Sequence, residues 1–101
     1  MIFTNLTMLI LGLNLSLNTS QYDTTGLLWI DFRQEQRSYL GWLTPYSHGR
    51  GVMSIWLKSY DNETMDYIIR HELEHLRCWR LEGNAGYVDN FIKHGGCFDE
   101  K

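Results

Sequence analysis

The chain has 101 residues, which fits a single domain over residues 1–101 and excludes large insertions. Hydrophobic residues make up 44% of the sequence and proline occurs once, a globular composition that excludes an intrinsically disordered chain. The formal net charge is −3, with nine basic residues scattered among twelve acidic ones, so we do not expect nucleic acid as the main partner.

Residues 1–18 form a mainly apolar run that invites comparison with a signal peptide. However, no basic residue precedes Arg33 and no small-x-small cleavage site is clean. The apolar run is also interrupted by Asn5, Thr7, Asn14 and Ser16. The run is also too short and too polar to span a bilayer comfortably. We therefore expect a cytoplasmic chain with no stable membrane insertion, and a weak signal or anchor is the alternative.

The same N-terminal segment carries two competing patterns of secondary structure. Residues 11–17, LGLNLSL, alternate as in a strand, but apolar residues also recur at helical spacing over a longer stretch, at Leu6, Leu9, Ile10, Leu13 and Leu17. Because the helical pattern is the longer one, we expect an N-terminal helix.

Three apolar and aromatic segments follow, each of strand length. They are GLLWIDF over residues 26–32, YLGWLTPY over 39–46 and GVMSIWLK over 51–58. The HGRG sequence between the last two is typical of a hairpin loop. We therefore expect a small sheet that is mainly antiparallel.

A long amphipathic helix is predicted after the third strand. Asp61 or Asn62 can cap its first turn, and Gly83 is a plausible C-cap after a last helical residue near Leu81. Its apolar stripe consists of Met65, Ile68, Ile69, Leu73 and Leu76. A shorter helix over about residues 85–93 ends before two glycines, so the sequence predicts an α+β fold with helices on one face of a three-stranded sheet.

The segment RHELEHLRCW, residues 70–79, places two histidines four residues apart on this helix. Residues i and i+4 lie on the same side of a helix, so His71 and His75 can direct two imidazole nitrogens to one Zn²⁺. Glu72 is rotated by about 100° from His71 and flanks the metal. There it can accept a proton from a water molecule that zinc polarises. The alternative is a pair of solvated histidines on an amphipathic helix.

The sequence GVMSIWLKSYDNETMDYIIRHELEHL, residues 51–76, resembles the core of zincin-type zinc metallopeptidases, in which a strand and a short connection precede the HExxH helix. The likeness extends over about residues 26–94, and the short chain is similar to minimal SprT-like or minigluzincin-like members. The resemblance implies hydrolysis of a peptide or protein substrate. It also implies that strand 51–58 is the sheet edge, where an extended substrate pairs by backbone hydrogen bonds.

A catalytic zinc ion usually has three protein ligands, and the motif supplies two. The metzincin pattern HExxHxxGxxH is not met, because Cys78 and Leu81 occupy the positions of the glycine and the third histidine. Cys78 lies about 10 Å along the helix axis from His71, so it cannot complete the same site on a straight helix. The third ligand is therefore expected after Gly83.

His94, 19 residues beyond His75, is the preferred third ligand, because a segment returning from the helix end needs about as many residues as the helix took to leave the motif. Asp89, 14 residues beyond His75, is the main alternative. The remaining possibilities are Glu82, Cys97 or no third ligand.

Several other residues receive a simpler interpretation. Cys78 and Cys97 are expected to be reduced thiols, although one bridge between them would tie the C-terminal segment to the motif. Tyr87 and His48 are candidate oxyanion donors, and each is more simply a surface or half-buried side chain. The four tryptophans are expected in the core or in a cleft wall: Trp29, Trp42, Trp56 and Trp79.

A second function class fits the same residues. In a non-catalytic binding module, zinc would be structural or absent and strand 51–58 would recruit a protein partner. The small size of the chain motivates this alternative, because little material is available for specificity pockets.

Overall fold

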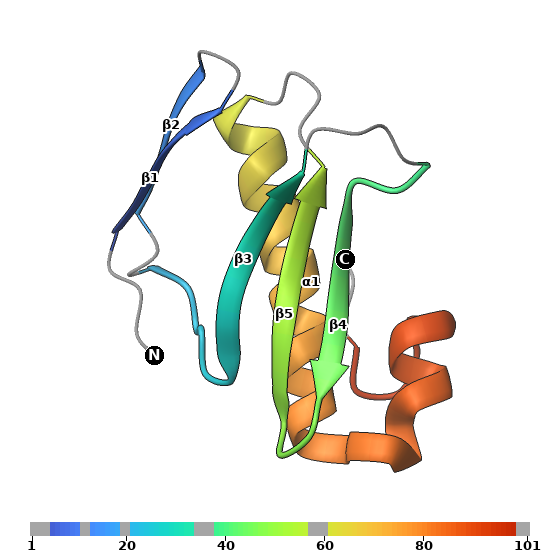
Figure 1. The fold of residues 1–101 in the computed structure, drawn as a ribbon. Coiled ribbons are helices and arrows are strands. Elements are labelled where there is room, and N and C mark those ends of the chain that lie inside the picture. Colours follow the sequence, from blue (N-terminus) through green and yellow to red (C-terminus); the bar gives the residue numbers. More distant parts are fainter. Residues whose placement is uncertain (1–4, 11–12, 19–20, 34–37, 57–60, 99–101) are drawn as a thin grey trace.

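The computed structural model describes residues 5–10, 13–18, 21–33, 38–56 and 61–98 (Figure 1). Five strands precede one long helix and two short helical turns. In chain order they are β1 (Asn5–Ile10), β2 (Leu13–Asn18), β3 (Leu27–Arg33), β4 (Gly41–Tyr46), β5 (Arg50–Trp56), α1 (Asn62–Glu82), the 3₁₀ turn η2 (Gly83–Gly86) and the π-helical turn η3 (Val88–Ile92). The predicted α+β class is confirmed.

The three-stranded sheet has the order β3-β5-β4 and is mixed. Strand β5 pairs in parallel with β3 and antiparallel with β4, so the expectation of a mainly antiparallel sheet is only half met. After β3 the chain first forms the outer strand β4, and β5 then lies between β3 and β4. Both sides of β5 are thus hydrogen-bonded, and the expectation that strand 51–58 is the sheet edge is wrong; residues 57 and 58 lie outside the described residues.

The hairpin between β4 and β5 is confirmed. Tyr46 pairs with Arg50, and the turn between them contains His48 and Gly49, both with positive φ. A Cβ on Gly49 would lie 2.8 Å from the Arg80 side chain, so glycine is needed here both for the backbone conformation and for the approach of α1. The hairpin places β4 as an outer strand with α1 beside it.

Helix α1 begins and ends where the sequence predicts. Asp61 is the N-cap, and its side chain accepts a 2.7 Å hydrogen bond from the backbone N–H of Thr64, which lowers the pKa of this carboxyl. Gly83 ends the helix with a positive φ, and its N–H bonds to the carbonyl of Trp79. These two caps fix the length of the helix that carries the histidine motif.

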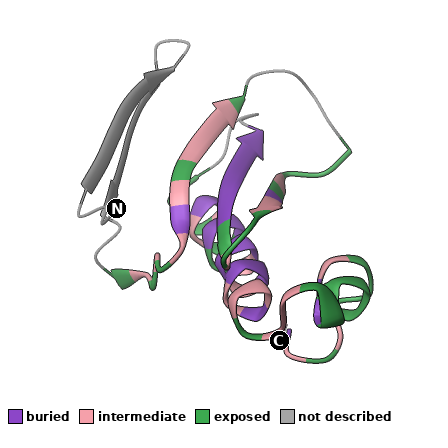
Figure 2. Cartoon of the chain, turned by 60° about the horizontal axis from the view of Figure 1, so that its bottom comes forward, coloured by how far each residue is buried: buried purple, intermediate pink, exposed green. Residues whose placement is uncertain are grey.

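Figure 1 shows α1 lying across one face of the three-stranded sheet, and the hydrophobic core is formed by side chains of these elements. The predicted apolar stripe is confirmed: Met65, Ile68, Ile69, Leu73 and Leu76 are all buried. They pack with sheet residues that include Leu43, Met53 and Ile55. Strand β5 is buried along both faces beyond Arg50, which Figure 2 shows as the purple central strand. The core therefore holds α1 in one orientation against β4 and β5.

The N-terminal segment is not helical. Strands β1 and β2 form a separate antiparallel pair in which Leu6 lies opposite Leu17 and Ile10 opposite Leu13. The expectation of an N-terminal helix is therefore wrong. The observed pairing follows the alternation of LNLSLN rather than the helical spacing of the leucines.

The predicted short helix over residues 85–93 is not a regular α-helix. The chain forms instead the 3₁₀ turn η2, which is tighter than an α-helix, and the π-helical turn η3, which is wider. Gly86, in η2, lies so close to α1 that a Cβ would meet the Glu82 carboxylate at 2.1 Å. This close approach turns the chain back along α1 into η3 and then to His94. No helix among the described residues is both long and apolar enough to cross a bilayer.

The contribution of the core is testable on α1 itself. Leu76 is fully buried, so Leu76→Ala should lower the free energy of unfolding by about 2–5 kcal/mol. Leu81→Ala is the matched control, because Leu81 is 66% exposed on the same helix and its truncation should change the value by less than about 0.5 kcal/mol. Urea denaturation under non-reducing conditions measures both, and equal effects would contradict the assignment of the core.

Candidate metal centre

The two motif histidines lie on the same side of α1, as their spacing requires. Their ring centroids are 5.1 Å apart. His75 is buried and His71 is half-buried, since the side of the helix on which they lie borders the apolar stripe. The helix therefore presents two imidazoles at the edge of the core rather than in open solvent.

His94 completes a group of three histidines. It follows η3, has a φ of 53°, and its ring centroid lies 5.0 Å from that of His71 and 4.8 Å from that of His75. One ligand nitrogen from each of the three residues lies within 4.8 Å of the others. Nitrogens bound to one zinc ion are about 3.4 Å apart, so movements of about 1 Å would close this group around an ion.

The donor set also fits a transition metal. Three neutral imidazoles suit zinc, copper, iron and nickel, whereas calcium and magnesium prefer oxygen ligands. The three histidines can therefore hold a metal ion. Asp89, the main alternative as third ligand, is not part of the group that the described residues form.

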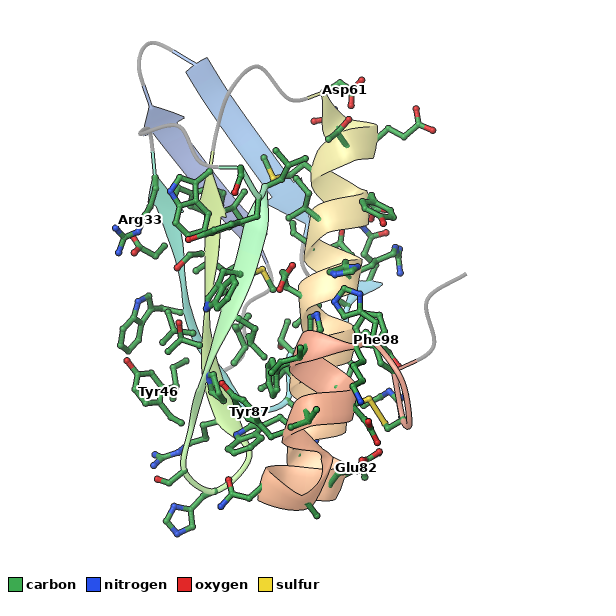
Figure 3. All side chains as sticks on the ribbon, turned by 90° about the vertical axis from the view of Figure 1, so that its right-hand side faces the viewer. Arg33, Tyr46, Asp61, Glu82, Tyr87 and Phe98 are labelled. Carbon is green, nitrogen blue, oxygen red and sulfur yellow. A yellow bond between two sulfur atoms is a disulfide. The ribbon has the colours of Figure 1, made fainter. Side chains whose placement is uncertain are left out.

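A disulfide bond ties the third histidine to the motif helix. Cys78, one turn after His75, is bridged to Cys97, and their Cα atoms are 5.6 Å apart. Figure 3 shows the yellow sulfur–sulfur bond between α1 and the C-terminal segment. The expectation of two reduced thiols is therefore wrong, and Cys97 is not available as a ligand. Arg77 adds a 3.1 Å hydrogen bond from its guanidinium to the carbonyl of Cys97.

Two phenylalanines pack against the histidine rings. Phe98 is buried, and its ring centroid lies within 5.1 Å of those of all three histidines. Phe91 stacks on His75 with an interplanar angle of 8°. These contacts restrict the rotation of the imidazoles and place apolar surface behind them. Figure 3 shows Phe98 beside α1, on the segment that returns from the helix end.

Asn90 contacts His75 at two points. Its Oδ1 lies 3.0 Å from His75 Nδ1, and its Nδ2 donates a 3.1 Å hydrogen bond to the backbone carbonyl of His75. The Asn90 side chain is 1% exposed, so no solvent competes for these bonds. The residue joins η3 to the middle of α1.

Glu72 is an acidic residue that lies beside this group of histidines. Its Oε2 lies 3.9 Å from Nε2 of His71. The residue is 5% exposed, and burial raises the pKa of its carboxyl to about 8. Gly41 of β4 makes room for it, because a Cβ there would lie 3.0 Å from Oε2.

A cavity of about 450 Å³ opens beside the three histidines and Glu72. Strand β4 forms one wall, and η3 with the residues next to it forms the other. The lining residues are Tyr39, Gly41, Trp42, Leu43, Pro45, His71, Glu72, His75, Tyr87, Phe91, Ile92 and His94. A second cavity of about 240 Å³ shares Tyr39, Gly41, His71 and Glu72 with the first, so the space between β4 and α1 extends to both sides of Glu72.

Of the remaining residues that the sequence analysis singled out, some line this cavity and others lie elsewhere in the fold. Tyr87 lines the larger cavity, whereas His48 is exposed in the β4–β5 turn. Trp42 forms part of the cavity wall although it is 51% exposed, and Trp79 donates a 2.7 Å hydrogen bond to the carbonyl of Tyr46. Trp56 is buried, but Trp29 is exposed and belongs neither to the core nor to this wall.

The residues that shape the site and that the sequence prediction omitted include Gly41, Asn90, Phe91 and Phe98. Asn90 and Phe98 lie close to the preferred third ligand in the chain, which is the only signal that pointed to them. Gly41 could not be found without the packing of β4 on α1, since nothing in its local sequence distinguishes it from a loop glycine.

Comparison of the chain with protein-family models, with curated proteins and with solved structures found no match. The site is therefore interpreted from its own geometry.

The composition of the metal centre can be tested by removing one ligand at a time. His71→Ala, His75→Ala and His94→Ala should each weaken zinc binding by more than the roughly 10–100-fold that loss of an outer-shell partner costs. His48→Ala and Asp89→Ala are the controls and should leave the affinity unchanged. Competition with a chromophoric chelator measures all five, and loss of affinity in Asp89→Ala with retention in His94→Ala would reverse the assignment of the third ligand.

The raised pKa of Glu72 predicts a pH-dependent stability of the protein in the presence of a chelator. The folded state keeps the carboxyl protonated up to about pH 8, whereas the unfolded chain ionises it near the ordinary value of 4.5. Between these values the folded state binds one proton more, so the free energy of unfolding should decrease as the pH rises from about 4.5 to about 8.

Glu72→Gln should remove this contribution, and Glu74→Gln, on the same helix but paired with Arg77, should retain it. Urea denaturation across this pH range gives the slopes for the three proteins. Identical slopes in the unaltered protein and in Glu72→Gln would show that Glu72 does not titrate in this way.

Proposed function

We propose that this protein is a zinc-dependent metallopeptidase of the zincin type that hydrolyses peptide bonds. The observation that carries the proposal is the arrangement of His71, His75 and His94 around one point, with the buried carboxyl of Glu72 beside them on the wall of an open cavity. A purely structural metal site has four protein ligands and is closed. Three ligands next to a cavity are typical of a catalytic site.

Zinc is the ion that we assign to this site. His71, His75 and His94 would hold it, and zinc bound there would polarise a water molecule and the carbonyl group of the substrate. The packing of Phe91 and Phe98 on the imidazoles keeps the three rings in place and limits the access of water from behind.

Glu72 is proposed as the general base and acid. Without a metal ion, burial raises the pKa of its carboxyl to about 8, and a zinc cation bound beside it would lower this pKa and favour the carboxylate form that acts as a base. In this role Glu72 takes a proton from the attacking water and gives it to the leaving amine. The backbone of Gly41 lies against the carboxyl group and restricts its position. Tyr87, on the opposite wall of the cavity, is a candidate to donate a hydrogen bond to the substrate.

The substrate is proposed to lie along β4 as an extended peptide. Strand β4 is at the end of the sheet order, so one of its sides has no strand partner among the residues that the structure describes. The two cavities between β4 and α1 extend to both sides of Glu72, as an extended chain on either side of a cleaved bond requires. Backbone hydrogen bonds to this edge would supply affinity independent of the peptide sequence. The pairing strand is thus β4, in place of strand 51–58.

The catalytic role of Glu72 is separable from metal binding. Glu72→Gln should lower the cleavage rate of an unfolded protein substrate by at least about 10²–10⁴-fold, because general acid–base catalysis contributes that much. Zinc affinity should stay within a few-fold, since Glu72 is not one of the ligands. Glu74→Gln removes a carboxylate two residues further along the same helix, where it pairs with Arg77, and should leave the rate unchanged.

Cleavage is measured by mass spectrometry of the products with the zinc-loaded protein. A Glu72→Gln variant that cleaves as fast as the unaltered protein would contradict the peptidase assignment and favour a non-catalytic binding module on the same fold.

A further inference from the structure

We propose that Asn90 is a positioning residue that fixes the tautomer and the ring orientation of His75, so that Nε2 of this histidine faces the metal site. The inference rests on the proposed metal centre, but it concerns a property of His75 that can be measured without any metal.

The contact is made by both ends of one buried amide. Oδ1 of Asn90 lies 3.0 Å from Nδ1 of His75, and Nδ2 donates to the His75 backbone carbonyl at 3.1 Å. The Asn90 side chain is 1% exposed, and an amide so deeply buried loses free energy unless both its groups are bonded. Here both groups bond to the same residue of another element.

The backbone carbonyl determines which way the amide points. A carbonyl oxygen only accepts hydrogen bonds, so the amide must present its NH₂ group to it. The opposite orientation would bring Oδ1 of Asn90 against the His75 carbonyl and leave two acceptors facing each other. The Oδ1 atom is therefore directed at the imidazole of His75.

The direction of the amide then determines the tautomer of the ring. Oδ1 is an acceptor, so the neighbouring Nδ1 must carry the proton and donate it. In the neutral imidazole the other nitrogen, Nε2, then has the free electron pair that a metal ion requires. The backbone carbonyl of His75 thus orients the Asn90 amide, and this amide in turn leaves Nε2 of His75 as the ligand atom.

The local backbone is built for this contact. Asn90 is the central residue of the π-helical turn η3, and π-helical turns occur frequently at functional sites. The next residue, Phe91, stacks on the face of the same imidazole at 5.2 Å between centroids. One short turn therefore holds His75 both in the plane of its ring, through Asn90, and on its face, through Phe91.

The first measurement is the tautomer of His75 in the chelator-treated protein, from two-bond ¹H–¹⁵N correlation spectra of the imidazole at a pH where it is neutral. We expect the Nδ1–H form. In Asn90→Ala we expect a shift to the Nε2–H form or to a mixture, and Asn84→Ala, an exposed asparagine in η2, should retain the spectrum of the unaltered protein. An Nε2–H ring in the unaltered protein would overturn the proposal even if no variant can be purified.

The second measurement is zinc affinity by competition with a chromophoric chelator. Asn90→Ala should weaken binding about 10–100-fold, as the loss of outer-shell partners does. Asn90→Asp keeps an acceptor for Nδ1–H, so it should retain the tautomer and recover most of the affinity. It should nevertheless be less stable than Asn90→Ala, since its buried charge also faces the His75 carbonyl.

If Asn90 had only a structural role, zinc affinity would follow the stability of the variants, and Asn90→Asp would bind zinc more weakly than Asn90→Ala. That result would overturn the proposal. Failure of the proposed function is distinguishable from this failure. If the unaltered protein binds no zinc, the metallopeptidase assignment fails, whereas the imidazole spectrum still decides the role of Asn90.

Discussion

The packing of α1 against the sheet is the constraint on which the rest of the molecule depends. Met53 and Ile55 of the central strand meet Ile69 and Leu76 of the helix in a core that excludes solvent. Because the histidine motif lies at the border of this buried stripe, the same contacts that stabilise the fold also fix the direction of His71. The carboxyl of Glu72, one residue further along, is then buried beside the strand that forms the cavity wall, and burial raises its pKa.

The second requirement is that the chain returns to the motif after α1 ends. Three contacts between residues 86 and 98 and helix α1 hold the returning segment in place. Gly86 permits a close turn, Asn90 bonds to a residue in the middle of the helix, and Phe98 packs under the imidazoles. The result is a site assembled from one rigid helix and one short connecting segment, which explains how a chain of 101 residues can bring three histidines together.

Several features that depend on local sequence could be predicted, although the N-terminal strand pair was not, and most of those that depend on distant packing could not. The caps at Asp61 and Gly83, the buried stripe and the β4–β5 turn follow from neighbouring residues, and so does the convergence of His71 with His75. The position of β5 in the middle of the sheet depends on a parallel pairing with β3, for which alternation of residues gives no signal. The contact of Asn90 joins residues 15 positions apart through a π-helical turn, which no periodicity indicates.

The bridge between Cys78 and Cys97 makes the candidate metal centre depend on the redox conditions around the protein. His94 is only three residues from Cys97, so the covalent link keeps this imidazole at a high effective concentration near the other two. Where thiols are kept reduced, the link opens and the ordering of that segment costs additional conformational entropy each time an ion is bound. Oxidant and metal supply would then act on the protein together, each increasing the response to the other.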